Sequence, residues 1–188
     1  MEKLFNGLQK YATGKLVSVL FVLTQIVYLS MIAYSIPAVT AFAPELPLFD
    51  MSPTGYTFAY ANELLSTLGA EGRHLYLTTQ LPLDCIYPGL FSLSYSLLLI
   101  WLFRKTFKAD SKVYYVAVVP FLGGIFDYIE NLFIIKMINS FPNLQAETVE
   151  MANAFTILKS SFVTIFFVLL LVGFALLLKQ KLSARTQS

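Results

Sequence analysis

Charged residues are scarce in this 188-residue chain: they make up 13% of it, while hydrophobic residues make up 57%. A soluble domain carries about 25% charged residues, so much of this chain must face something other than water. The single cysteine, Cys85, excludes an internal disulfide, and without a Cys/His cluster there is no basis for a zinc site. The net charge of +2 is too small to indicate an anionic partner, so we expect no nucleic acid partner.

Familiar catalytic motifs are also missing. The sequence has no GxSxG, HExxH, P-loop or dinucleotide-binding motif, so nothing supports a standard hydrolase, protease or nucleotide-dependent enzyme. We therefore expect no cofactor. His74 is the only histidine, and beside Arg73 it fits a solvated loop position better than a catalytic one.

Four apolar stretches are each long enough to cross the hydrocarbon core of a bilayer, which takes about 20 helical residues. They are residues 16–36, 81–103, 113–138 and 152–178. Their continuous apolar runs lack the alternation of a barrel strand, so helices are the expected spanning structures. The sequence therefore predicts a single all-α integral membrane domain over residues 1–188, built as a four-transmembrane-helix bundle.

Basic residues predict how the spans are oriented. Most of the 13 lysines and arginines lie before the first span, between the second and third, or after the fourth: Lys3, Lys10, Lys15, Arg104, Lys105, Lys108, Lys112, Lys179, Lys181 and Arg185. The positive-inside rule then predicts a cell membrane protein with both termini in the cytoplasm. The first apolar run is longer than a signal-peptide core, so we expect an uncleaved helix there.

The connection of residues 37–80 is the only sizeable segment between the predicted spans. Pro37, Pro44 and Pro47 predict that it begins in an extended conformation. Ser52-Pro53 is typical of a helix start and Gly69 of a helix end, with apolar residues at helical spacing between them. We expect a short amphipathic helix that lies on the outer membrane surface or caps the bundle as a lid.

Ionisable residues occur within three of the predicted spans, all in the outer half of the bilayer. Asp84 lies about 5 Å and Lys159 about 10 Å below the outer ends of their helices. Asp127, Glu130 and Asn131 stand at i, i+3 and i+4, so they share one helix face. We expect this face to turn inward, with Lys159 forming an ion pair with Glu130 or Asp127.

Intramembrane charges mark functional sites by default. The candidate catalytic residues are Asp84, Asp127 and Glu130: in an enzyme, Asp127 or Glu130 would carry a proton while Asp84 orients the polar head of the substrate. The candidate ligand-binding residues are Lys159, Asn131, Tyr87, Tyr128 and Gln25. Lys159 at similar depth disfavours a cation cage built from the acids, so no metal is expected.

These residues favour binding, with or without chemical transformation, of a small lipid-like molecule from the outer leaflet. The expected partners are membrane lipids and a small hydrophobic ligand, and the oligomeric state stays open. A proton or cation relay is one alternative, although the inner halves of the spans are nearly free of ionisable groups. A structural or partner-binding subunit, in which the cluster only locks the bundle, is the other.

Three spaced motifs carry a resemblance: Gly72-Arg73-x-x-Tyr76-Leu77, Leu81-Pro82-Leu83-Asp84-x-x-Tyr87-Pro88 and Asp127-Tyr128-x-Glu130-Asn131. With them the chain resembles small, mostly bacterial four-span membrane proteins of unassigned function, which implies the fold and no activity. The layout of four spans with a long first outer connection is also similar to the EXPERA family of sterol isomerases and sigma-2-type receptors. That second resemblance implies a sterol-like ligand inside the bundle.

Overall fold

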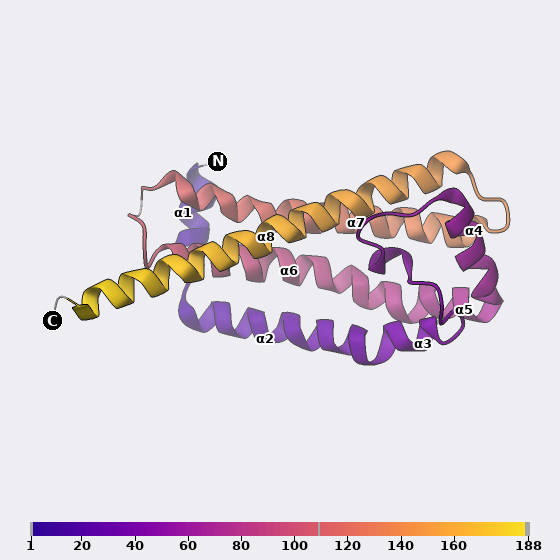
Figure 1. Ribbon diagram of the computed structural model, residues 1–188, viewed down its shortest axis with the longest axis horizontal. Helices are drawn as coiled ribbons and strands as arrows, with labels where there is room; N and C mark the ends of the chain where they lie inside the picture. Colours follow the sequence, from indigo (N-terminus) through magenta and orange to yellow (C-terminus); the bar gives the residue numbers. More distant parts are fainter. Residues whose placement is uncertain (1, 109, 187–188) are drawn as a thin grey trace.

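The computed structural model describes residues 2–108 and 110–186, with side chains described for residues 7–108 and 110–183. Within these ranges it contains helices and no strands. Four helical units are long and apolar enough to cross a membrane, and they run side by side along the long axis of the molecule (Figure 1): Gly14–Thr40, Gly69–Phe103, Lys112–Ser140 and Ala146–Ser183. The predicted all-α bundle with four membrane-spanning helices is confirmed.

Each unit is longer than the apolar stretch that predicted it. The first unit consists of α2 (Gly14–Ser30), η1 (Met31–Ser35) and α3 (Ile36–Thr40), and the second of α5 (Gly69–Leu75), η3 (Tyr76–Gln80) and α6 (Leu81–Phe103). The third consists of η4 (Lys112–Ala117) and α7 (Val118–Ser140), and the fourth is α8 (Ala146–Thr186). A further helix, α1 (Glu2–Tyr11), precedes α2.

Two of the units contain a π-helical segment, η1 and η3, and each segment is followed two residues later by a proline. The predicted extended start at Pro37 is wrong, because the helix continues through this residue to Thr40. Pro37 and Pro82 both lie in the first turn of the α-helix that follows the π segment. Proline has no N–H and cannot donate the next main-chain hydrogen bond of a continuous helix, so a break in the α-helical pattern just before each proline is expected.

Residues 41–68 form a lid over one end of the bundle, which we call the lid end. Within the lid, η2 (Phe49–Met51) precedes α4 (Phe58–Thr67). The predicted helix start at Ser52-Pro53 is wrong: α4 begins at Phe58, and the Thr57 side chain caps it by accepting a hydrogen bond from the Tyr60 N–H. Phe49 is fully buried with Leu65 of α4 in the apolar core at this end, which holds the lid in place.

Helix α6 lies at the centre of the bundle, where it packs against α2 and α7, and α7 packs against α8. Gly124 allows α6 and α7 to approach closely, because a Cβ atom here would lie 2.8 Å from the Pro88 carbonyl oxygen. The Ser92 hydroxyl donates a hydrogen bond to the Pro120 carbonyl at 3.2 Å, and the Ser96 hydroxyl donates to the Ala117 carbonyl at 2.6 Å. Small residues and short polar contacts therefore fix the α6–α7 pair.

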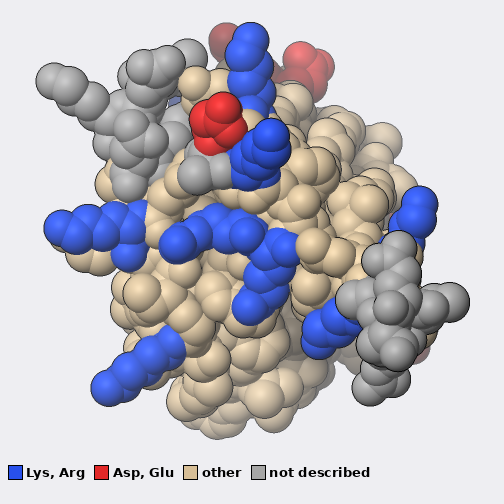
Figure 2. All heavy atoms as spheres, turned by 90° about the vertical axis from the view of Figure 1, so that its left-hand side faces the viewer, with Lys and Arg blue, Asp and Glu red and all other residues tan. Residues whose placement is uncertain are grey.

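The opposite end of the molecule, which we call the basic end, carries α1, the α6–α7 connection and the last turns of α8. Figure 2 views this end and shows lysine and arginine side chains projecting over much of its face. Arg104 donates a hydrogen bond to the Gln9 carbonyl at 2.8 Å, and the Lys105 ammonium lies 4.4 Å from the centre of the Trp101 ring. The long sides of the bundle are apolar by contrast, with Leu171 69% exposed, as expected of a surface in contact with acyl chains.

Candidate functional site

Lys159 of α8 lies at the centre of a buried charge cluster between α7 and α8. Its ammonium group donates a hydrogen bond to Asp127 Oδ1 at 3.3 Å and forms a second ion pair with Glu130 Oε2. The predicted ion pair is thus present, and it involves both carboxylates of α7. The i, i+3 spacing of Asp127 and Glu130 explains this, because it places both carboxylates on the side of α7 that packs against α8.

Glu130 is the most completely buried member of the cluster and has two partners. Besides Lys159, it accepts a hydrogen bond at Oε1 from the Thr156 hydroxyl at 2.5 Å. Thr156 and Lys159 are three residues apart on α8, so they reach the same carboxylate. Glu130 does not line the cavity described below. The residue therefore joins the two helices and holds Lys159.

Asp84 of α6 is a buried carboxylate of a different kind. It is 3% exposed, and its Oδ2 atom has no hydrogen-bond partner among the described residues. Asn131 does not satisfy it: the Asn131 amide instead donates to the Asp84 main-chain carbonyl at 3.0 Å, which ties α7 to α6. A buried polar group without a partner costs free energy, and for a carboxylate within a membrane span that cost is larger still.

Asp50 of the lid reaches the same interior space. The Tyr76 hydroxyl donates a hydrogen bond to Asp50 Oδ1 at 2.5 Å, and the Gln80 amide donates to Oδ2 at 3.0 Å. Gln80 in turn accepts a hydrogen bond from the Ser35 hydroxyl at 2.5 Å. A chain of hydrogen bonds thus connects the first span, the second span and the lid.

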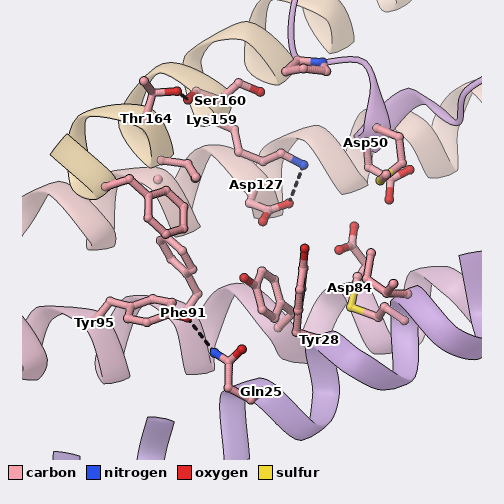
Figure 3. Close-up of a pocket in the computed structure, with 18 of the residues that line it drawn as sticks. Gln25, Tyr28, Asp50, Asp84, Phe91, Tyr95, Asp127, Lys159, Ser160 and Thr164 are labelled. Atoms are coloured by element: carbon pink, nitrogen blue, oxygen red, sulfur yellow. Dashed lines mark hydrogen bonds and ion pairs between the residues drawn. The ribbon is translucent and has the colours of Figure 1, made fainter. Parts of the chain in front are cut away.

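A cavity of about 620 Å³ joins these groups. Its polar end is lined by Asp50, Asp84, Asp127 and Lys159. Figure 3 shows the Asp84 carboxylate pointing across the cavity toward Asp50, with Asp127 and Lys159 on the opposite wall. Three carboxylates from three separate elements therefore face one space that contains one ammonium group.

The rest of the cavity is apolar and aromatic and lies between α2 and α8. These two helices have little contact with each other among the described residues, and both contribute walls to the cavity. Phe21 of α2 and Phe167 of α8 line it while being 41% and 49% exposed. The cavity wall thus reaches the lateral surface of the bundle, where acyl chains would surround it.

A second polar contact lies farther along the cavity, away from the lid. The Gln25 amide donates a hydrogen bond to the Tyr95 hydroxyl at 2.8 Å, and both side chains line the cavity (Figure 3). Between this pair and the acids, the Tyr28 and Tyr87 rings contact each other with their centres 5.7 Å apart. Gln25 and Tyr87 therefore occupy cavity positions, as the sequence indicated.

Not every predicted site residue faces the cavity. Tyr128 is 41% exposed on α7, and its hydroxyl lies against Gly89 of α6, so its predicted place in the pocket is wrong. Asn131 and Glu130 are buried behind the cavity wall and position other groups. Of the four charged residues expected to meet, Lys159, Asp127 and Glu130 are in contact, while Asp84 lies across the cavity from them.

Asp50 was not among the site residues that the sequence predicted. A usable signal precedes it: Leu46-Pro47-Leu48-Phe49 is an apolar run inside a connecting segment, and Leu48 and Phe49 are fully buried. A loop that buries apolar side chains also brings the adjacent residue into the interior.

Burial raises the pKa of the Tyr56 hydroxyl in the lid, so this phenol stays neutral beside the acids.

The site combines unbalanced charge with a hydrophobic cavity. Its described residues provide four carboxylates and one ammonium group, and they include no group of three or more His, Cys, Asp or Glu side chains that could hold a metal ion. Such a site can bind a polar head among the acids and an apolar body along the α2–α8 gap. Asp84 and Asp127 line the cavity and are placed to exchange protons with a bound molecule.

Comparison of this chain with protein-family models, with curated proteins and with solved structures found no match.

Proposed function

We propose that this multi-pass membrane protein binds a small lipid-like molecule taken from the surrounding bilayer. One observation carries the proposal: a cavity of about 620 Å³ runs from Asp84, a buried carboxylate whose Oδ2 atom has no partner among the described residues, to the lipid-facing gap between α2 and α8. Cavities of about 300–1,000 Å³ are typical of sites for small organic ligands. Asp84 and Asp127 would contact the polar head of the ligand, and the aromatic walls would contact its body.

The charge distribution supports binding over a purely structural role. A carboxylate that only locks a helix bundle is expected to have a partner, as Glu130 has in Lys159 and Thr156. Among the side chains that the structure describes, none pairs with Asp84 Oδ2 in this way. Keeping a carboxylate there costs free energy of folding, and a ligand that pairs with it offsets that cost when it binds.

The basic end supports an orientation with both termini in the cytoplasm. The acids then lie toward the outer side of a cell membrane, and the ligand would come from the outer leaflet. In a version with chemistry, Asp127 or Asp84 would transfer a proton to or from the bound molecule. A proton relay across the membrane has less support, because the cavity residues beyond Asp127 toward the basic end carry no ionisable group other than phenols.

Two neighbouring serines of α8 provide a matched test. Ser160 lines the cavity, whereas Ser161 is exposed and does not line it. Ser160→Phe should therefore fill the cavity, while Ser161→Phe places the same ring outside it. The wild-type protein and both variants would be purified in a mild neutral detergent, and retained amphiphiles would be identified by native mass spectrometry followed by lipid extraction.

We expect one class of small amphiphile to remain bound to the wild-type protein and to Ser161→Phe and to be lost from Ser160→Phe. The proposal is wrong if the wild-type protein retains only bulk phospholipid, or if both variants retain the same molecule to the same extent.

A further inference from the structure

The polar end of the cavity has more acidic than basic side chains among the described residues. Lys159 forms ion pairs with Glu130 and Asp127, and one ammonium group can neutralise only one of these carboxylates. Asp50 and Asp84 add two further carboxylates to the same space. With all four acids ionised the cluster carries a net charge of −3 (four carboxylates against one ammonium).

We infer that the ligand of this site carries a primary ammonium head group on a small apolar body. The inference rests on the proposed function and names the chemical class of the molecule that the cavity takes. The ionised carboxylates of Asp50, Asp84 and Asp127 would repel one another in this poorly hydrated space. A cation bound among them is attracted to each carboxylate and so offsets this repulsion. Asp84 lines the cavity and has a carboxylate oxygen without a hydrogen-bond partner among the described residues, so its carboxylate is the one that such a cation would stabilise most.

The number of carboxylates favours a primary ammonium over other cations. An ammonium group of the lysine type has three N–H donors. Asp50, Asp84 and Asp127 come from the lid, α6 and α7, so they approach the cavity from three directions and offer one acceptor each. A trimethylammonium group has no N–H donor and cannot form these hydrogen bonds. A neutral alcohol would leave the charge imbalance unchanged.

Asp50 also links binding to the lid. It already accepts hydrogen bonds from Tyr76 and Gln80, so it is held in place before any ligand arrives. A cationic ligand that contacts Asp50, Asp84 and Asp127 together would therefore connect the lid to α6 and α7 and offset the repulsion among the three carboxylates.

The test compares three probes with the same 14-carbon chain: tetradecylamine, tetradecyltrimethylammonium and 1-tetradecanol. Binding to the full-length protein in phosphatidylcholine nanodiscs would be measured by native mass spectrometry titration. The proteins are wild type, Asp84→Asn, Ser160→Phe as the filled-cavity control, and Glu63→Gln as a variant that removes the same charge from an exposed position of α4.

We expect wild type and Glu63→Gln to bind tetradecylamine at least about tenfold more tightly than either other probe, the size of one charge-assisted hydrogen bond. Asp84→Asn should lose this preference, and Ser160→Phe should bind none of the probes. Comparison of the three probes on wild type needs no variant, so misfolding of Asp84→Asn would not obscure the result.

Three results would overturn the inference. Equal binding of the trimethylammonium probe would show that N–H donors are not recognised, and equal binding of the alcohol would show that charge is not. If no probe binds to wild type, the ammonium assignment fails. In each case the retained-lipid comparison of Ser160→Phe with Ser161→Phe judges the proposed function separately.

Discussion

Asp84 is buried and the Lys159 side chain is 12% exposed, yet replacement of these two charged residues should have opposite effects on stability. Lys159→Met removes the ammonium group that contacts Glu130 and Asp127 and keeps a long, unbranched side chain. Glu130 is fully buried and does not line the cavity, so its carboxylate gains no access to water when the ammonium group is removed. Removing one partner of a buried ion pair costs about 3–5 kcal/mol, and we expect the free energy of unfolding to fall by this amount.

Asp84→Asn should leave the free energy of unfolding unchanged or raise it, by up to about 3 kcal/mol, the cost of placing a charged side chain within a span. The reason is that its Oδ2 atom has no partner to lose. Adding Glu130→Gln to Lys159→Met should recover about 2 kcal/mol, since one of the two stranded carboxylates is then removed. Steric trapping in bicelles measures these free energies directly. The reasoning fails if Lys159→Met is as stable as wild type, or if Asp84→Asn is as destabilising as Lys159→Met.

Two further predictions concern the helix contact and the lid. Gly124→Ala should lower the free energy of unfolding by about 1–3 kcal/mol, because its Cβ would lie 2.8 Å from the Pro88 carbonyl oxygen. Gly7→Ala, with open space around the new Cβ, is the control. Equal melting temperatures of the two variants would contradict this close contact of α6 and α7. Asp50→Ala should speed hydrogen exchange of lid amides, since it removes both acceptors of Tyr76 and Gln80. Glu45→Ala, at an exposed lid position, should not; equal exchange in the two variants would refute the role of Asp50.

The spans were predictable because hydrocarbon imposes a length and a composition that few other environments do. The contact of Lys159 with Asp127 and Glu130 was also predictable, since an unpaired charge has few alternatives inside a membrane. Helical spacing alone placed both acids on one face. These successes depend on the solvent and on local geometry, which the sequence carries directly.

The failures have a different cause. Pro37 was expected to begin an extended segment, but the helix continues through it to Thr40 after a π segment. Tyr128 is next to Asp127 in the sequence, but its side chain lies against Gly89 of α6. Residues three or four apart share a helix face, whereas neighbouring residues are about 100° apart around the helix axis. Asp50 reaches the site through the path of the lid. Such positions depend on how distant segments pack together, which the spacing of neighbouring residues does not show.

The two π segments end at residues that hydrogen-bond to each other, Ser35 and Gln80. A π turn holds about one residue more than an α turn, which rotates the following side chains by about 100° relative to an uninterrupted helix. A helical wheel drawn straight through either span will therefore misassign the residues beyond the break. In a deep mutational scan, the periodicity of tolerated polar substitutions should slip by one position in both spans at the same depth.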